Sequence, residues 1–394
     1  MTIDGQIELL RRGTTEIIGE EDLRRKLASG KPLRVKLGVD PTAAHVTLGW
    51  AVVLRKLRDF QKLGHTACLI IGDFTALIGD PSGKSKTRKQ LTRDEVQANV
   101  EAVSSQIYKI LDPEKTVIYY NKDWLGKMGF EDVIRLCSRY TVARIMERDD
   151  FTKRWENHQP IAMHEILYPL CQGMDSVEIE SDVELGGNDQ KFNNLVGRTL
   201  MEQYGQEPQA VILCPLLVGT DGKEKMSQSL GNYVSVIDTP NDMFGKTMSI
   251  PDNLIENWFE LCTDVPMDEV RAMLEPGKNP RDAKIRLGKE IVALYHSVED
   301  AESAERFFVE TFSQKKQVTD APDLAVSGEI MAVELVMLAG GADSRGAAKK
   351  LIQAGAVSLD GDKIADLGAA WPASDLDGRI LRVGKKLFFK LSAQ

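Results

Sequence analysis

Residues 33–71 constrain the fold of this chain most strongly. An apolar, β-branched run at 33–39 ends in Asp-Pro-Thr, and a helical pattern of apolar residues follows from about residue 48 to Gly64. The next run, 66–71, is apolar without polar alternation, which is typical of a strand buried on both faces. Strand, helix and strand in about 40 residues make a βαβ unit. The sequence therefore predicts an α/β fold with a parallel sheet, whose ligands bind at the carboxyl ends of the strands.

The turn inside this unit has the features of a phosphate-binding site. Asp40 and Thr42 follow the first strand, Thr47 stands where a helix N-cap is expected, and Gly49 lies in the first helical turn. The free N–H groups of a helix N-terminus bind anions. One glycine in such a turn is common to many nucleotide-binding folds, so the pattern alone does not choose among them.

Length and composition limit the class of protein. The chain has 394 residues, enough for two or three domains that each bury a core. It contains neither an apolar run of the roughly 18 residues that a membrane-spanning helix needs nor a signal-peptide pattern, so we expect a cytoplasmic protein. Its five cysteines are scattered without a CxxC pair, and we expect neither disulfides nor a protein-bound metal.

The charge is unevenly distributed. The net charge of −9 argues against a protein that coats nucleic acid indiscriminately. Residues 331–394, however, carry nine basic and seven acidic side chains, which leaves 41 basic and 52 acidic ones for the rest of the chain. The C-terminal part is therefore the place to look for an RNA contact.

A glycine-rich loop at residues 79–88 nearly spells a nucleotide-binding P-loop. A Walker A motif needs four residues between its glycines, whereas three separate Gly79 from Gly83 here. The missing residue changes the backbone nest that cradles the phosphates, so we do not expect a P-loop NTPase.

Polar residues recur on one face of a predicted helix at Tyr168, Gln172 and Asp175. Such a stripe either faces solvent or lines a polar pocket, and the spacing leaves both interpretations open. Two further polar loops follow, Gly186-Gly187-Asn188-Asp189-Gln190 and Lys225-Met226-Ser227-Gln228-Ser229.

From about residue 33 to 235 these motifs resemble the bacterial tyrosyl-tRNA synthetases, which are class I aminoacyl-tRNA synthetases. Residues 47–50 occupy the register of the family's His-Ile-Gly-His or His-Leu-Gly-His signature, but Thr47 and Trp50 replace both histidines, and His45 is out of register. The loop at 225–229 resembles the Lys-Met-Ser-Lys-Ser signature, with Gln228 in place of the second lysine.

The resemblance implies a role for individual residues. Those that it assigns to tyrosine are Lys36, Asp80, Tyr168, Gln172, Asp175 and Gln190, with Asp175 at the phenol. Those that it assigns to ATP are Gly38, Asp40, Thr42, Thr47, Gly49, Trp50, Gly187, Asp189, Lys225 and Ser227. The groups that it implies for catalysis at the phosphates are Lys225, Lys84, Arg88 and Thr47, with Mg²⁺ accompanying ATP.

The implied activity is that of a tyrosine–tRNA ligase. Tyrosine would attack the α-phosphate of ATP to give tyrosyl-adenylate, and the tyrosyl group would pass to the 3′ end of tRNA(Tyr). Because the attacking carboxylate is already ionised, catalysis would consist mainly of positioning and of cationic stabilisation of the phosphates. Two alternatives remain: a tryptophanyl-type ligase, and a catalytically weakened or inactive paralogue that binds RNA.

The expected organisation has four parts. Residues 1–235 would form a Rossmann-like catalytic domain, in which the segment at about 112–160 connects its halves and makes a homodimer. Residues 236–312 would be a helical domain of the anticodon-binding type and 313–329 a linker. Residues 330–394 resemble a small α+β S4 RNA-binding domain, in which Arg345, Lys349 and Lys350 suit phosphate contact; a solvated helix face is the alternative.

Overall fold

The computed structural model describes residues 1–39, 45–79, 93–313, 322–384 and 387–393. The chain divides into two compact units, Met1–Glu302 and Ser303–Gln394, and each is described here by itself.

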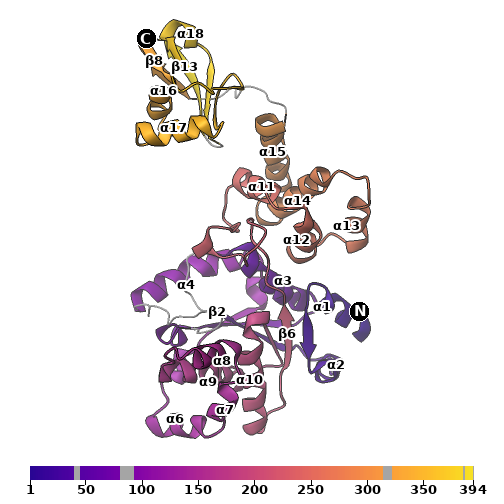
Figure 1. The fold of residues 1–394 in the computed structure, drawn as a ribbon. Coiled ribbons are helices and arrows are strands. Elements are labelled where there is room, and N and C mark those ends of the chain that lie inside the picture. Colours follow the sequence, from indigo (N-terminus) through magenta and orange to yellow (C-terminus); the bar gives the residue numbers. More distant parts are fainter. Residues whose placement is uncertain (40–44, 80–92, 314–321, 385–386, 394) are drawn as a thin grey trace. The chain divides into compact units, whose positions relative to one another are not determined.

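A six-stranded sheet forms the centre of the first unit (Figure 1). Its strands are β1 (Glu16–Ile18), β2 (Arg34–Val39), β3 (Thr66–Ile71), β4 (Thr116–Tyr120), β5 (Val183–Gly187) and β6 (Ala210–Cys214), in the order β1-β6-β5-β2-β3-β4. All neighbours are parallel except β1, which runs antiparallel to β6. The predicted α/β parallel sheet is confirmed. The edge strand β1 was not predicted, because three residues are too few to show a period of two.

Helices cover both faces of this sheet, which explains why its strands are apolar on both sides. In β3, Ala67 to Ile71 are at most 1% exposed. In Figure 1, α3 lies to one side of the sheet, and α9 and α10 lie to the other. The helices of this layered part are α1 (Ile3–Arg11), α2 (Glu20–Ala28), α3 (Leu48–Lys62), α4 (Arg93–Ile107), α9 (Met163–Glu178) and α10 (Lys191–Gln203).

The strand order reverses at β2, and this reversal positions the site. From β2 the chain passes through α3 to β3 on one side, whereas β5 pairs with the opposite edge of β2. Ligands of open α/β sheets bind beside the carboxyl ends of the strands at such a switch point. The candidate site therefore lies where β2 and β5 end.

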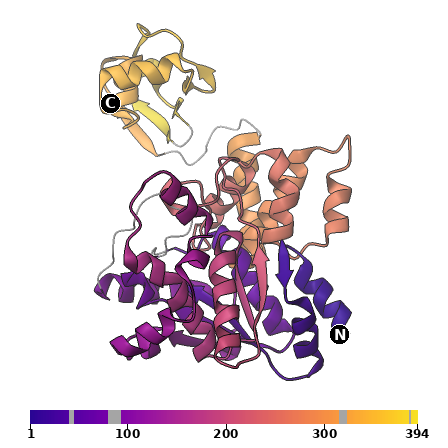
Figure 2. The same ribbon diagram turned by 60° about the horizontal axis from the view of Figure 1, so that its bottom comes forward.

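Further helices complete the first unit. The apolar spacing also predicts helical structure at residues 131–155, and three helices lie there. Those between β4 and α9 are α5 (Lys122–Leu125), α6 (Phe130–Cys137), α7 (Val142–Ile145) and α8 (Asp149–Glu156). Those after β6 are α11 (Pro240–Met248), α12 (Ile255–Cys262), α13 (Met267–Met273) and α14 (Pro280–Tyr295), which group together in Figures 1 and 2. The helix α15 (Val298–Phe308) begins in the first unit and ends in the second. None of the helices in the described ranges is both long and apolar enough to span a lipid bilayer.

The second unit is a small α+β structure around one apolar core. Its main sheet has the order β10-β9-β12-β13-β7, and β8 pairs with β11. The elements are β7 (Asp323–Val326), β8 (Glu329–Met331), α16 (Ala332–Leu338), α17 (Arg345–Gln353), β9 (Val357–Leu359), β10 (Asp362–Lys363), β11 (Ala370–Pro372), α18 (Ala373–Leu376), β12 (Ile380–Val383) and β13 (Leu387–Ala393). Both α16 and α17 pack their apolar faces on this sheet through residues such as Leu335 and Ile352.

Candidate active site

A buried carboxylate, Asp175 on α9, lies at one end of the candidate site. It is 3% exposed. The indole Nε1–H of Trp124 donates to its Oδ1 over 2.9 Å, and the amide of Asn121 donates to its Oδ2 over 3.4 Å. Burial raises the pKa of Asp175 to about 7, although the positive charge of Lys36 opposes the shift. A carboxylate held in this way can accept a further hydrogen bond from a ligand hydroxyl.

Sequence reasoning missed both donors to Asp175. Asn121 is itself fixed, because its Oδ1 accepts from the N–H of Phe74 over 3.0 Å and its amide donates to Thr75 Oγ1 over 3.1 Å. The signal was available: Asn121 and Trp124 follow directly after β4, at the edge of the sheet where the other strands also end.

Lys36 lies in the middle of β2 and is fully buried. Its ammonium group pairs with Glu184 Oε1 over 2.9 Å and donates to Ser176 Oγ over 2.7 Å and to the Gln172 carbonyl over 2.9 Å. Glu184 in turn accepts from the Gln172 side-chain amide over 3.3 Å. Buried charges need such partners. Lys36 therefore connects the sheet to α9, because it contacts Glu184 on β5 and Ser176 on α9. The sequence did not predict these two contacts.

Tyr168 and Gln172 precede Asp175 on α9. Tyr168 is 4% exposed and Gln172 is half-buried. The polar stripe predicted from their spacing thus turns toward the protein, in contact with the network of Lys36 and Glu184, rather than toward bulk solvent.

The carboxyl end of β2 borders open space, whereas that of β5 is crowded. Gly38 is exposed although it lies in a central strand, and a Cβ added there would meet nothing within 4 Å. At Gly187, by contrast, a Cβ would approach Asp189 Oδ1 to 2.8 Å and Leu216 to 2.9 Å. Gly187 therefore allows the turn that presents Asp189, followed by Gln190, whose Oε1 accepts from Asn193 over 3.1 Å.

Thr47 begins α3 as its N-cap, as predicted. Its Oγ1 accepts from the N–H of Trp50 over 3.3 Å, and Thr47 is 8% exposed. Its backbone also pairs with Ser235 in an isolated antiparallel bridge. Trp50 is half-buried in the first turn of the helix.

The segment 222–231, called the signature loop below, packs against the beginning of α3. Lys225 Nζ lies 3.1 Å from Asp189 Oδ2, and the N–H of Gly49 donates to Met226 Sδ over 3.1 Å. Ser227 Oγ lies 2.9 Å from Ser229 Oγ. The structure thus brings Lys225, Asp189 and the start of α3 together beside the end of β5. Five predicted residues lie outside the described ranges: Asp40, Thr42, Asp80, Lys84 and Arg88.

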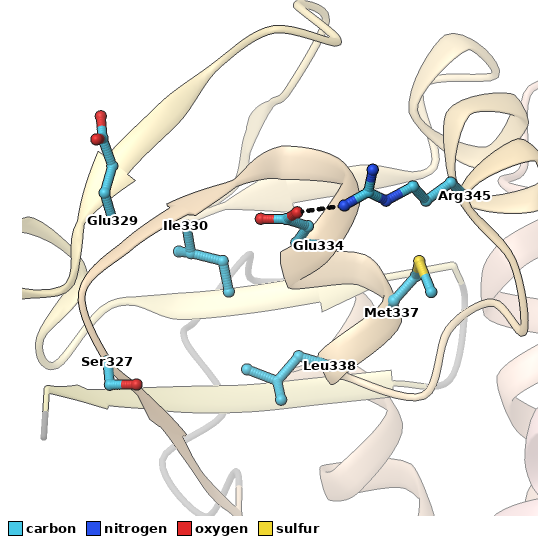
Figure 3. Close-up of a pocket in the computed structure, with 7 residues that line it drawn as sticks. All are labelled: Ser327, Glu329, Ile330, Glu334, Met337, Leu338 and Arg345. Carbon is cyan, nitrogen blue, oxygen red and sulfur yellow. Dashed lines mark hydrogen bonds and ion pairs between the residues drawn. The ribbon is translucent and has the colours of Figure 1, made fainter.

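The three basic residues predicted to bind RNA belong to the second unit. Arg345, Lys349 and Lys350 are exposed on α17. Arg345 pairs with Glu334 Oε1 of α16 over 2.7 Å. Figure 3 shows this pair at the rim of an open pocket of about 400 Å³, whose other lining residues are Ser327, Glu329, Ile330, Met337 and Leu338.

Comparison with known proteins identifies the family. A family model described as class I tRNA synthetases (W and Y) matches residues 28–313. The tyrosine–tRNA ligase of Carboxydothermus hydrogenoformans is 51% identical over 98% of this chain and 97% of its own length. That of Thermotoga maritima is 49% identical over 100% and 98%.

Solved structures agree at the level of the fold. The tyrosyl-tRNA synthetase of Archaeoglobus fulgidus complexed with L-tyrosine superposes with a TM-score of 0.64 at 22% identity, over 77% of this chain and 100% of that one. A truncated mitochondrial tyrosyl-tRNA synthetase of Aspergillus nidulans gives 0.65 at 18% identity, over 79% and 100%. The chain therefore belongs to the class I tRNA synthetases of the tryptophanyl and tyrosyl family, and its full-length relatives in that family are tyrosine–tRNA ligases.

Proposed function

We propose that this chain is an active tyrosine–tRNA ligase, which converts L-tyrosine and ATP to tyrosyl-adenylate and transfers the tyrosyl group to the 3′ end of tRNA(Tyr). The observation that carries the proposal is the environment of Asp175. Its buried carboxylate accepts from two N–H donors outside α9, and it lies on the same face of α9 as Tyr168 and Gln172. A phenol hydroxyl is the ligand group that satisfies such an acceptor.

Selection of tyrosine follows from the cost of leaving that acceptor unpaired. The phenol would donate to Asp175, while Trp124 and Asn121 hold the carboxylate in place. Phenylalanine would close the same carboxylate off from water without adding the phenol's hydrogen bond, and a buried acceptor that loses a hydrogen bond costs about 1–3 kcal/mol. Tyr168, Gln172 and Asp80 would bind the amino group, and Gln190 the carboxylate.

Adenylation needs the tyrosine carboxylate in line with the α-phosphate and positive charge where the phosphates depart. ATP would lie over Gly38, with its ribose on Asp189 and its phosphates at the start of α3. Once a ribose hydroxyl occupies Asp189, Lys225 can leave its 3.1 Å ion pair and meet the phosphates. Lys84 and Arg88 would add further positive charge, and Mg²⁺ on the phosphates of ATP would neutralise part of theirs.

Amino-acid-dependent exchange of labelled pyrophosphate into ATP tests the proposal. We expect exchange with tyrosine and none above background with phenylalanine or tryptophan. Exchange that depends on tryptophan would assign a tryptophanyl-type ligase instead. Exchange with no amino acid, in protein that is folded by circular dichroism, would assign an inactive paralogue.

We also propose that the second unit binds the tRNA through α17. Lys349 and Lys350 are exposed there, and Glu334 orients Arg345 beside them. Replacing Lys349 and Lys350 by Glu should raise the KM for tRNA about tenfold and weaken its salt dependence, with pyrophosphate exchange unchanged. The control is Lys363→Glu, an exposed lysine of β10 in the same unit. An equal effect of control and test variants would contradict a specific role of α17.

A homodimer is proposed from exposed apolar side chains in and beside the segment 112–160. Phe130, Ile134, Val142, Trp155 and Met163 are 82%, 54%, 62%, 71% and 73% exposed. Large apolar side chains gathered on one region mark protein–protein contacts. One chain has a mass of 43.7 kDa, and light scattering should give about twice that value. Phe130→Asp should reduce the measured mass to that of one chain. A monomeric parent would refute the dimer.

A further inference from the structure

Gln228 makes a side-chain contact that leaves the signature loop. Its amide Nε2 donates to the backbone carbonyl of His45 over 2.5 Å. His45 stands two residues before Thr47, the N-cap of α3. The position that the signature gives to a phosphate-binding lysine is therefore occupied by a neutral amide bound to the protein's own backbone.

The remaining contacts of the loop show why this one matters. Inside the loop region, Asn232 is 4% exposed and accepts from the N–H of Ser227 over 2.8 Å, while its amide donates to Asp221 over 2.8 Å. These bonds fix the loop's shape but tie it to nothing outside its own hairpin. Outside the hairpin, Gln228 bonds to the segment just before α3, the N–H of Gly49 makes a weak contact with Met226, and Lys225 pairs with Asp189.

The close approach at Gly49 makes the docked position well defined. A Cβ on Gly49 would lie 3.2 Å from Met226 Cβ, and Met226 is 9% exposed. After the loop, the chain continues to Val234, whose carbonyl accepts a hydrogen bond from the N–H of Leu48 over 2.9 Å. The loop thus lies on the first turn of α3, with Lys225 directed toward Asp189.

We propose that Gln228 is a positioning residue: by donating to the His45 carbonyl it keeps the signature loop docked on the start of α3 and so presents Lys225 at the nucleotide side of the site. This inference rests on the proposed function. A second lysine here would bring another positive charge near Lys225, whereas the amide makes its hydrogen bond without one. Lys225 then supplies the positive charge of the signature loop, and Gln228 holds the loop in place.

The test compares Gln228→Ala and Gln228→Glu with the parent in the full chain. Glutamate has nearly the shape of glutamine but sets a carboxylate oxygen against the His45 carbonyl. The control is Ser229→Ala, which changes an exposed side chain of the same loop whose hydrogen bond stays within the loop. Amide hydrogen exchange of residues 222–231 and tryptic cleavage after Lys223 and Lys225 report the docking, and single-turnover adenylate formation reports its use.

We expect about 3- to 10-fold faster exchange and cleavage in Gln228→Ala and more in Gln228→Glu, with no change in the control. Adenylate formation should slow about tenfold at saturating ATP, while KM for tyrosine changes less than about twofold. Unchanged amide hydrogen exchange in both Gln228 variants would overturn the proposal. Faster amide hydrogen exchange with an unchanged adenylation rate would also overturn it. A parent that forms no adenylate would refute the proposed function, and the exchange measurement would still decide whether Gln228 holds the loop.

Discussion

The two sides of this site are built in opposite ways. On the proposed amino-acid side, Lys36, Glu184 and Asp175 are at most 3% exposed, and each has at least two polar partners. On the proposed nucleotide side, the side chains of Lys225 and Asp189 are 50% and 28% exposed and pair with each other. The first is a fixed buried network, whereas the second depends on a few contacts that a ligand can replace.

This difference agrees with where the chain departs from the signatures that its motifs resemble. The three altered positions, Thr47, Trp50 and Gln228, all lie on the proposed nucleotide side. There, the N–H groups at the start of α3 bind anions whatever side chain follows. In the buried network, by contrast, a single replacement leaves a charge without its partner, so that changes are costly.

The largest effect should come from breaking the buried pair. Lys36→Met removes one charge and leaves Glu184, which is 1% exposed, without its ion-pair partner. Loss of one member of a buried pair costs about 3–5 kcal/mol of unfolding free energy. Urea unfolding followed by tryptophan fluorescence measures it.

Two controls sharpen this comparison. Lys225→Met breaks the half-exposed pair with Asp189 and should cost less than about 1 kcal/mol. The double variant Lys36→Met, Glu184→Gln should recover part of the loss, because no unpaired charge remains. Equal destabilisation by Lys36→Met and Lys225→Met would show that the two sides are not built differently.

Most of the fold could be predicted from local patterns. A β-branched apolar run identified β2, an apolar run without alternation identified β3, and the N-cap and apolar spacing placed α3 to within a residue or two. The edge strand β1 could not be found, since Glu16–Ile18 has no readable period and is a strand only because it pairs with β6.

The candidate site was less predictable than the fold. The helical spacing of Tyr168, Gln172 and Asp175 put them on one face, but only the folded chain shows that this face is turned inward. The partners of Asp175 come from residues 51 and 54 positions away, which no local pattern links to α9. The contact of Gln228 with a backbone carbonyl 183 positions away is likewise invisible to side-chain spacing.

The second largest effect should come from replacing Asp175, the proposed acceptor of the phenol hydroxyl. Asp175→Asn keeps the shape but has one acceptor oxygen, which cannot serve Trp124, Asn121 and a phenol together. We expect kcat/KM for tyrosine to fall about 100-fold, the size of a lost hydrogen bond to a charged group. For phenylalanine it should change less than about threefold, so that the preference shrinks. Pyrophosphate exchange at subsaturating amino acid gives both values. If Asp175→Asn prefers tyrosine over phenylalanine as strongly as the parent does, Asp175 does not bind the phenol.

The smallest effect, a pH dependence, separates the two sides without disrupting either. Burial raises the pKa of Asp175 to about 7, so the carboxylate that we propose as the acceptor of the phenol predominates above pH 7 and is replaced by the acid as the pH falls. The dissociation constant for tyrosine, measured without ATP, should therefore rise about tenfold from pH 8 to pH 6, because the ionised fraction falls from about nine-tenths to about one-tenth.

The same group acts on stability, since a carboxyl whose pKa is raised by folding stabilises the protein below about pH 4 and loses that contribution as the pH rises through 7. Asp175→Asn cannot ionise, so it should bind tyrosine with no pH step, and its stability relative to the parent should increase from pH 5 to pH 8. A tyrosine affinity that is flat in the parent would mean that the ionisation of Asp175 does not control the phenol site. A step that persists in the variant would assign the titration to another group.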